Sequence, residues 1–352
     1  MLTGKELILA TKPFAKEIRW KSWYYTISSY ILLVAALLGT IFIPTNNSWG
    51  IWGRIACSIF SAGMLARMFI IFHDYQHHSI LQKSFLANVL FTAFGFYMIT
   101  PPSIWKRSHD HHHANNAKLF SASIGSFPLM TKQKFLEADK KERFFYLAVR
   151  HWLNMFFAYF TTFMFGMCIQ SFMSNKKKHW DSLAVLIVHY TIATLLIVYF
   201  GFGTYFLTFF LPFFLSHMLG AYLFYAQHNF PGAKYKNNTD WNYSEAALES
   251  SSYMPLNPIM RWFTANIGYH HIHHLNSRIP FYRLPEAMAA IPELQNPSTT
   301  SLKLKDIKSC LRLKAWDPET DSMIGYAAME VIPVRSAAKR QMRRRRKMAE
   351  VA

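Results

Sequence analysis

The chain has 352 residues, of which 52% are hydrophobic and 17% are aromatic, and its formal net charge is +19. An apolar composition combined with a large positive charge is typical of a membrane protein that has basic cytoplasmic segments. A soluble two-domain protein is excluded, because several apolar runs of the sequence approach the ~20 residues that are needed to cross a bilayer.

The first membrane helix is predicted at residues 24–43. Residues 1–23 mix basic and acidic side chains without a small-residue cleavage pattern, so we expect a cytoplasmic N-terminus and no signal peptide. Arg19, Lys21 and Trp23 give the start of the helix a basic and aromatic collar. Such a collar places this end of the helix inside the cell.

The second membrane helix is predicted at residues 51–72. The preceding loop, residues 44–50, carries no Lys or Arg, as expected of an outer loop, so the second helix returns to the inner edge of the membrane. Arg54 and Arg67 lie within one or two turns of its ends. We expect both side chains to extend toward the membrane surface.

Three histidine-rich segments, here called the first, second and third histidine boxes, lie at His73–His78, His109–His113 and His270–His274. Boxes that share one metal site must lie on the same side of the bilayer. Residues 85–100 separate the first two boxes, and at ~1.5 Å per residue they are too short for a hydrocarbon core of ~30 Å. We therefore predict an in-plane or re-entrant helix for this segment.

Three further apolar segments, residues 152–173, 183–200 and 205–227, separate the second box from the third. Only an even number of them can cross the bilayer if the boxes share one side. Three consecutive lysines from Lys176 onward place the loop after the first segment in the cytoplasm, whereas residues 201–204 are uncharged. We therefore expect the first segment to remain on the inner leaflet, although its length would allow a crossing, and the other two to form a crossing hairpin.

The chain thus divides into a membrane domain at residues 24–228, a cytoplasmic cap with the third box at residues 229–335, and a polybasic tail at residues 336–352. The tail is either a solvated, disordered end or a segment that binds anionic lipid headgroups, at ~1 kcal/mol per basic residue near the surface. The predicted fold is an all-α integral membrane protein. It has four transmembrane helices, in-plane or re-entrant helices, and a cytoplasmic helical cap that holds a di-metal site.

The histidines recur at helical spacing. His270, His273 and His274 have the spacing i, i+3, i+4, which places three imidazoles on one face of a helix. A low-complexity histidine tract would instead form one continuous run. Together with His228, which follows the last crossing segment on the same membrane face, the candidate metal ligands are His73, His77, His78, His109, His112, His113, His228, His270, His273 and His274.

Ten candidate ligands are too many for one ion, because a catalytic zinc typically uses three protein ligands, so two metal ions are indicated. The three cysteines, Cys57, Cys168 and Cys310, are too few and too scattered for a disulfide framework or a thiolate metal site. Imidazole suits zinc, copper, iron and nickel, and the ligand type therefore does not distinguish among these metals.

Four other residues beside the ligands are candidates for a supporting role. Asp74 and Asp110 each follow the first histidine of a box, where a carboxylate can accept a hydrogen bond from the second ring nitrogen of a ligand. His111 and His271 fall off the ligand spacing and are supporting, surface or spare-ligand candidates.

Two further histidines, His189 and His217, lie within the predicted crossing segments. A polar residue in such a segment either marks function or makes a hydrogen bond between helices, and both readings stay open.

The order and spacing of the boxes, HxxxHH, HxxHH and HxxHH, resemble those of the membrane fatty acyl desaturases. The similarity extends to WKRSHDHHH at residues 105–113, FYAQHNF at 224–230 and NIGYHHIHHLNSRIPFYRLPEA at 266–287, and it covers roughly residues 72–285. The chain is most similar to the methyl-end branch, that is, to Δ12 and ω3 acyl-lipid desaturases of the bacterial type. It has no HPGG haem motif, so no fused cytochrome b5 domain is expected.

The resemblance implies four crossing helices under a cytoplasmic cap, with two non-haem iron ions held by histidines of the three boxes and by His228. It implies that O2 and two electrons remove two hydrogens from adjacent carbons of a membrane-lipid acyl chain and leave a cis double bond. It places the protein in the bacterial inner membrane, or in the endoplasmic reticulum of a eukaryote, with the active site on the cytoplasmic side.

The resemblance also implies an external electron donor, either ferredoxin or a cytochrome b5-type protein, and a basic cytoplasmic face would favour an acidic donor. No nucleic acid partner is expected. The oligomeric state, the position of the double bond and the lipid carrier of the acyl chain stay open.

Three alternatives compete with this interpretation. A fatty acyl hydroxylase or an acetylenase would use the same di-iron scaffold, and the histidine boxes do not distinguish it from a desaturase. A zinc-dependent membrane hydrolase would need far fewer ligands. A membrane metal transporter would place its ligands near the middle of the membrane along a path, whereas these histidines cluster at helix ends and in the cap.

Overall fold

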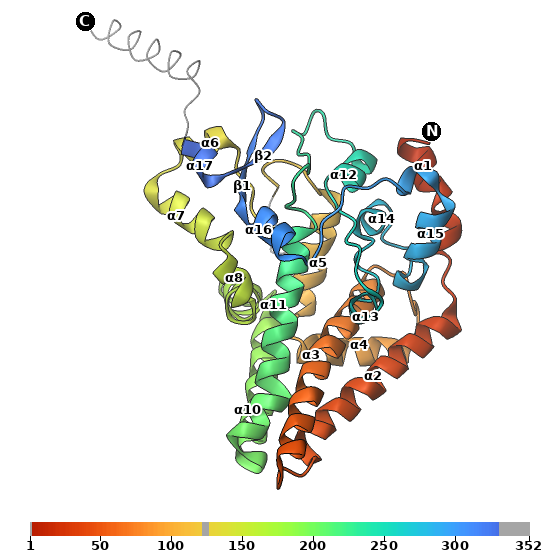
Figure 1. Ribbon diagram of the computed structural model, residues 1–352, viewed down its shortest axis with the longest axis vertical. Helices are drawn as coiled ribbons and strands as arrows, with labels where there is room; N and C mark the ends of the chain where they lie inside the picture. Colours follow the sequence, from red (N-terminus) through yellow and green to blue (C-terminus); the bar gives the residue numbers. More distant parts are fainter. Residues whose placement is uncertain (1, 122–126, 331–352) are drawn as a thin grey trace, which may run out of the picture.

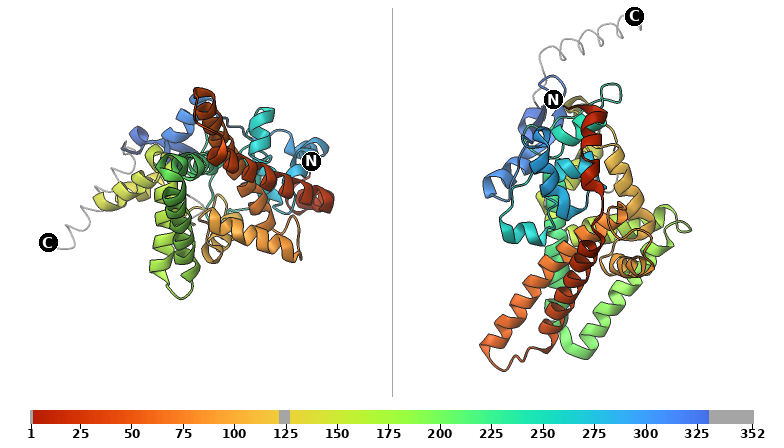
Figure 2. Two further views of the ribbon diagram at one scale, coloured as in Figure 1. Left: turned by 90° about the horizontal axis from the view of Figure 1, so that it is seen from below. Right: turned by 90° about the vertical axis from the view of Figure 1, so that its right-hand side faces the viewer.

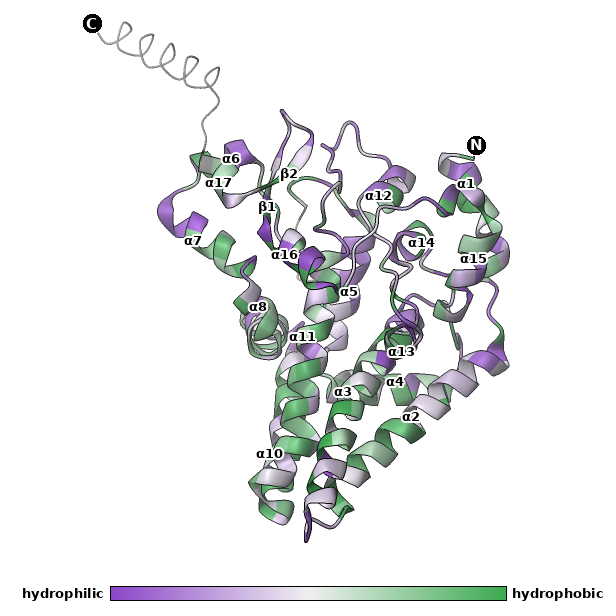
Figure 3. Ribbon diagram, in the orientation of Figure 1, coloured by the Kyte–Doolittle hydropathy of each residue, from purple (hydrophilic) through white to green (hydrophobic). Residues whose placement is uncertain are grey.

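Apolar helices form one end of the molecule, and polar segments gather at the other end (Figures 1 and 3). The computed structural model describes residues 2–121 and 127–330, which are mostly helical, as the sequence predicts. Three described helices are long and apolar enough to cross a membrane: Arg19–Phe42, Ser48–Gln76 and Trp180–Ala226. The number is four if a bent pair of shorter helices, Phe85–Tyr97 and Pro102–Ala114, counts as one span.

Helices α2 (Arg19–Phe42) and α3 (Ser48–Gln76) pack against each other at the apolar end. The buried side chains of α2 are mostly small. Small residues allow two helices to approach closely, and the resulting packing contacts hold the helices together within lipid. The large apolar side chains of α2 stay exposed on its other faces. Both helices begin earlier than the predicted segments, and their crossing of a bilayer stays a prediction. The buried side chains of α2 recur every three or four residues and are mostly small: Ser22, Thr26, Ser29, Leu33, Ala36 and Thr40.

The long apolar run Trp180–Ala226 is broken at Gly201. The backbone angles there, φ 81° and ψ 163°, lie in a region that is essentially restricted to glycine. The chain folds back at this point, so that α10 (Trp180–Tyr205) and α11 (Leu211–Ala226), joined by the π-helix η3 (Phe206–Phe210), form two arms (Figure 2). The break falls in the uncharged segment where the sequence predicts the turn of a hairpin.

Helices α4 (Phe85–Tyr97) and α5 (Pro102–Ala114) meet at an angle of 94°. The bend follows from Pro101 and Pro102, because proline lacks an N–H group and is tolerated only in the first turn of a helix. α4 lies across the long axis of the molecule, whereas α5 runs toward the polar end (Figure 2). The bend therefore carries the second histidine box away from the apolar end.

The predicted segment 152–173 forms α8 (Trp152–Phe156), the π-helix η2 (Tyr159–Gln170) and the short α9 (Ser171–Ser174). It is seen end-on in Figure 1 and therefore also lies across the long axis. That neither this segment nor the segment at 85–100 crosses a bilayer stays a prediction.

The polar end consists of short helices, 3-10 turns and one small sheet. The strands β1 (Leu313–Asp317) and β2 (Ser322–Gly325) pair antiparallel, so the prediction of an all-α fold is wrong in this detail. The segment is too short for two packed helices, and a hairpin satisfies its backbone groups while burying Trp316. The predicted tail at 336–352 lies outside the described residues. The helical elements of this end are α1 (Gly4–Ala10), η1 (Lys12–Ala15), α6 (Lys132–Glu137), α7 (Lys140–Val149), α12 (Tyr243–Glu249), α13 (Pro258–Phe263), α14 (His270–Leu275), η4 (Phe281–Arg283), α15 (Leu284–Ala290), η5 (Pro292–Leu294), α16 (Leu304–Arg312) and α17 (Tyr326–Glu330).

The side chain of Arg67 is directed to the polar end of the molecule, and its extension toward the membrane surface stays a prediction. Its side chain is buried, donates from Nε to Ser29 Oγ at 2.9 Å, and also donates to the backbone carbonyl of Trp262. The guanidinium carbon lies 4.4 Å from the centre of the Trp262 ring, within the range of a cation–π contact. Arg67 therefore joins α2 and α3 to α13, where the polar end covers it. Arg54, by contrast, reaches the loop after α2 and donates to Ile43 O at 2.7 Å.

Replacing Gly268 by alanine is expected to destabilise the fold around α14. A Cβ atom at Gly268 would lie 2.4 Å from the carbonyl oxygen of Met254, a backbone atom that cannot rotate away. Overpacking of this kind costs ~1–3 kcal/mol. Gly220→Ala is the control, since it lies in α11 with nothing within 4 Å, and alanine there favours the helix. The thermal unfolding midpoint should fall for Gly268→Ala alone, and an equal fall in both variants would contradict the prediction.

Candidate metal centre

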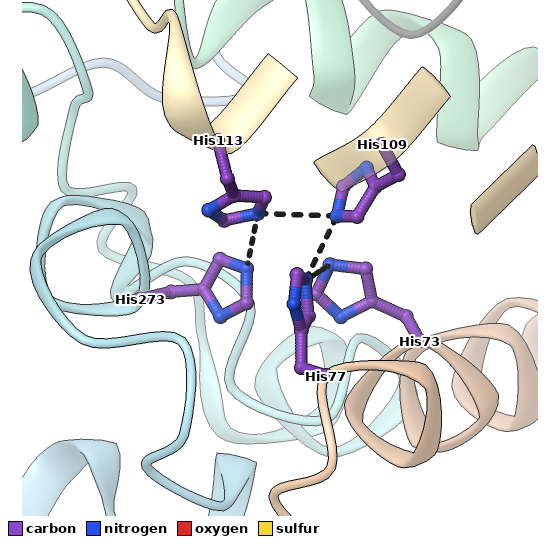
Figure 4. A group of neighbouring side chains, drawn as sticks. All are labelled: His73, His77, His109, His113 and His273. Carbon is purple, nitrogen blue, oxygen red and sulfur yellow. Dashed lines mark hydrogen bonds between the residues drawn. The ribbon is translucent and has the colours of Figure 1, made fainter. Parts of the chain in front are cut away.

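Five histidines converge between α3, α5 and α14, and we call them the five-histidine group: His73, His77, His109, His113 and His273. All five side chains are buried. The end of α3 supplies two of them, α5 supplies two, and α14 supplies one (Figure 4). Each group member offers one ring nitrogen, and these nitrogens all lie within 4.8 Å of one another.

The nitrogen spacing within this group fits a common metal ion. The Nε2 atom of His77 lies 3.2 Å from that of His73 and 2.9 Å from that of His109 (Figure 4). The Nε2 atom of His113 lies 3.1 Å from that of His109 and 3.1 Å from that of His273. Two nitrogens that each lie ~2.1 Å from one ion, with ~90° between them, are ~3 Å apart.

Hydrogen bonding among the rings cannot explain all four contacts. A ring nitrogen of a neutral imidazole is either a donor with one proton or an acceptor, but not both. His77, His109 and His113 each face two neighbouring Nε2 atoms, so no placement of single protons converts every contact into a hydrogen bond. One cation could instead accept all these lone pairs at the same time.

A second set, the four-histidine group, consists of His112, His228, His270 and His274. The Nε2 atom of His228 lies 3.0 Å from that of His112 and 2.9 Å from that of His270. The Nε2 atoms of His270 and His274 are 3.1 Å apart. His228 is half-buried, whereas the other three are buried. The spacing again fits ligands of one ion.

Helices α5 and α14 contribute to both groups. Ligands four residues apart, such as His109 and His113 or His270 and His274, lie on one face of a helix and enter the same group. The third histidine of each box, His112 or His273, enters the other group. The two groups are adjacent, since the rings of His113 and His274 stack with centroids 4.2 Å apart. The arrangement therefore offers two neighbouring groups of imidazoles, each of which could hold a metal ion.

Burial favours the neutral form of His228 and of the imidazoles of α14. Desolvation lowers the pKa of His228 to about 4 and holds the pKa values of His270, His273 and His274 well below the ordinary value of 6.5. Nearby histidines lower them further, because two positive rings would repel each other. A neutral ring has the free lone pair that a metal ligand needs.

Acidification should destabilise the metal-free protein. The folded state holds these rings neutral, whereas the unfolded chain binds protons below its ordinary histidine pKa of 6.5. The unfolded state therefore binds more protons, and the free energy of unfolding falls as the pH drops through about 6.5 toward about 4. Thermal unfolding of chelator-treated protein between about pH 7.5 and pH 5 checks this. A midpoint that is constant or rises on acidification would contradict it.

Three predicted site residues are exposed and lie outside both groups. His78 is exposed and has a left-handed φ of 58°, because α3 ends at Gln76 and the chain turns away after His77. The structure therefore does not bring it to the other candidate ligands, and the set of ten is reduced to nine. Asp110 is exposed and pairs with Lys106 at 2.7 Å. His111 is exposed and lies 3.0 Å from Ser121 Oγ.

Two other candidates are buried beside the groups. Asp74 Oδ1 lies 3.4 Å from Nδ1 of His73, and Asp74 Oδ2 accepts a hydrogen bond from Phe281 N at 2.7 Å. This carboxylate thus holds a ligand ring and fixes the chain after α14. His271 Nε2 donates instead to the carbonyl of Leu294 at 3.1 Å, so His271 anchors α14 without joining either group.

Replacing Asp74 by asparagine is expected to weaken metal binding ~10–100-fold, as for other residues that orient metal-ligating histidines. Asparagine has one side-chain oxygen where aspartate has two. This oxygen can accept a hydrogen bond from Phe281 N or face His73, but it cannot do both. Asp110→Asn is the matched control, since Asp110 also follows the first histidine of a box but is exposed. Competition with a chelator of known affinity measures the effect. Equal metal loss in both variants would contradict the role assigned to Asp74.

Three supporting residues could not be identified from the sequence. The Trp105 ring stacks on His109 with centroids 4.8 Å apart and planes at 14°. The i, i+4 spacing of this pair was the only available signal. His228 Nδ1 donates to Ser250 O at 3.1 Å, and Tyr235 donates to the carbonyl of His228. Ser250 lies 22 positions and Tyr235 seven positions after His228, in a segment without regular helical spacing, so no local pattern reveals these contacts.

The histidines of the apolar helices do not join the groups. His189 Nε2 lies 2.5 Å from Tyr159 Oη, which is a hydrogen bond between α10 and η2. His217 Nδ1 donates to Phe213 O at 2.7 Å within α11. The sequence leaves open whether these two histidines have a functional or a structural role. Their contacts favour the structural role.

Comparison with known proteins supplies an independent finding. A family model described as "Fatty acid desaturase" matches residues 47–301, a range that contains both histidine groups. A "Fatty acid desaturase" of Bacillus subtilis (strain 168) is 29% identical over 284 residues, which cover 80% of this chain and 79% of the relative.

Two relatives with more specific names are more distant. An "sn-1 oleoyl-lipid 12-desaturase" of Synechocystis sp. is 22% identical over 289 residues, which cover 79% of this chain and 77% of the relative. A "Delta(12) fatty acid dehydrogenase" of Crepis alpina is 24% identical over 325 residues, which cover 82% and 81% of the two chains. Each alignment therefore extends over most of both proteins.

Proposed function

Because the chain belongs to the fatty acid desaturase family, we propose that it is an acyl-lipid desaturase that uses O2 and two electrons to introduce a cis double bond into a fatty acyl chain of a membrane lipid. The observation that carries the proposal is the convergence of nine imidazoles into two adjacent groups. The relatives named as 12-desaturase and Delta(12) dehydrogenase favour the Δ12/ω6 position over the ω3 position.

We propose that the two groups hold two non-haem iron ions. The donor set fits this assignment, since imidazole ligates iron as well as zinc, copper or nickel, and membership of the family favours iron. Bound iron would supply the redox chemistry that activates O2. The residues of the chain have defined parts in this arrangement. Asp74 orients His73, the carbonyl of Ser250 fixes the tautomer of His228, and burial of the rings limits the access of water.

We further propose that α2, α3, α10 and α11 cross the membrane and that the polar end forms a cytoplasmic cap. Two features support this orientation: His73 and His77 end α3, and His228 follows α11, so both long arms deliver ligands to the same end. α4 and the segment 152–173 would then lie along the inner leaflet. A carbon in the middle of a lipid acyl chain could reach the metal centre from the bilayer, while electrons arrive from the cytoplasm.

The deciding experiment is the fatty-acid profile of a host that expresses this chain, with double bonds located by mass spectrometry. A new dienoic acid supports the proposal and fixes the position of the double bond. A hydroxylated or acetylenic product would move the assignment to the alternative reactions on the same scaffold. Metal analysis of the purified protein gives a second readout, and zinc without iron in protein offered both metals would contradict the redox function.

A further inference from the structure

A cavity of about 160 Å³ lies beside the four-histidine group. His112 and His228 form part of its wall. The cavity reaches the surface at His111, Phe120 and Lys134, whose side chains are exposed. His228 is also the one half-buried member among the nine histidines of the two groups. Within the described part of the chain, this cavity is therefore a place where the four-histidine group lies close to solvent.

The lining of the cavity carries charge of one sign. Lys118, Lys134 and Arg150 contribute positive groups, and no Asp or Glu occurs among the described residues that line it. Arg150 is 2% exposed, donates to the carbonyl of Pro128 at 2.9 Å and contacts the side chain of Asn229. None of its hydrogen-bond partners in the described chain is a carboxylate. Its charge is thus uncompensated, and low-dielectric walls focus such a field toward the mouth of a cleft.

The rim of the cavity also has features of a protein interface. Phe120 is 60% exposed and has a left-handed φ of 65°, which is unusual for a bulky side chain. The Lys134 ammonium lies 5.1 Å from the centre of the Phe120 ring, and the Lys118 ammonium lies 4.5 Å from the centre of the Trp241 ring. Aromatic side chains are enriched at surfaces that bind other proteins, and basic groups beside them attract an acidic partner. The helix α6, which carries Lys134, lies at the polar end, away from the apolar helices (Figure 1).

We propose that the mouth of this cavity is the docking surface for an acidic protein that carries single electrons. The inference rests on the proposed function, whose balance requires an external reductant: O2, two electrons, two protons and two substrate hydrogens give two molecules of water and one double bond. The carrier is oxidised twice in each turnover. Docking here places its redox group next to His112 and His228, and the basic rim attracts its acidic surface.

Charge reversal of the rim tests the proposal. The variant is Lys118→Glu with Lys134→Glu, and the probes are a plant-type [2Fe–2S] ferredoxin and soluble cytochrome b5. Binding to the full chain in nanodiscs of zwitterionic lipid is measured at low and high ionic strength. We expect wild-type binding that weakens with salt, and binding by the variant that is weaker by about tenfold or more at low salt. The matched control is Lys176→Glu with Lys177→Glu, which removes the same charge from an exposed loop elsewhere.

Several results would overturn the proposal. One is that neither the ferredoxin nor the cytochrome b5 binds to the wild type. The others are an equal weakening of carrier binding in both double variants and a loss of bound iron from the rim variant. A rim variant that loses affinity for anionic phospholipid vesicles while keeping its affinity for the carriers would assign these lysines to lipid instead. The proposed function fails separately, if the wild type binds a carrier but forms no desaturated product with it.

Discussion

Replacing His112 by alanine is expected to abolish formation of the unsaturated product, with a loss of at least about 100-fold, because outer residues that only orient ligands already cost ~10–100-fold. His112 is one of four imidazoles in its group, and its Nε2 atom lies 3.0 Å from that of His228. Removing it leaves three ligands and opens the site to the neighbouring cavity. Bound iron should fall from roughly two ions to roughly one per chain, because the five-histidine group keeps all its ligands.

The neighbouring residue provides a matched control. His111→Ala removes the same side chain one position earlier in the same helix, but His111 is exposed and belongs to neither group. We expect His111→Ala to keep both iron ions and to lose far less product formation than His112→Ala, since His111 only borders the mouth of the cavity. Fatty-acid profiles and iron analysis of the two variants, expressed side by side, test the prediction. Equal loss of product in both would show that the grouping of the histidines does not decide activity.

Replacing Trp316 by alanine is expected to lower the free energy of unfolding by ~3–5 kcal/mol, the range for removing a buried aromatic side chain. Trp316 is 2% exposed and packs with Leu119 and Met323 at the polar end. Its ring centroid lies 5.5 Å from that of Tyr235, which in turn donates to the carbonyl of His228. The cavity left by the substitution should therefore also loosen the four-histidine group.

The measurement is thermal unfolding of the purified protein together with its iron content. Trp20→Ala is the control, since Trp20 is 67% exposed and its removal leaves no internal cavity. We expect a clear fall in the unfolding midpoint and weaker retention of iron for Trp316→Ala alone. A midpoint unchanged from that of Trp20→Ala would show that Trp316 does not stabilise this part of the fold.

Local spacing accounts for most of the candidate centre. A helix brings residues four positions apart onto one face, so the sequence itself pairs His109 with His113 and His270 with His274. The same argument fails at His78, because it assumes that α3 continues, whereas the helix ends at Gln76 and the chain enters a left-handed turn. A helix end is set by the contacts of the following segment as well as by the local sequence.

The assignment of supporting residues depended even more on tertiary contacts. Asp74 and Asp110 occupy equivalent positions in their boxes, yet Asp74 is buried against His73 and Phe281, whereas Asp110 pairs with Lys106 at the surface. Nothing in the local sequence distinguishes the two carboxylates. Burial decides their roles, and burial depends on which distant segment covers each helix.

The sequence by itself determined the membrane class, the helical nature of most of the chain, and most of the histidines of the candidate metal centre, because composition, apolar length and periodicity are local properties. Only the tertiary structure decided that nine histidines divide into groups of five and four and that Arg67 is buried beneath α13. It also decided that a short hairpin completes the polar end and that a basic cavity reaches the four-histidine group. These features arise where segments far apart in the chain meet, and their energies depend on burial and on partners that no local pattern contains.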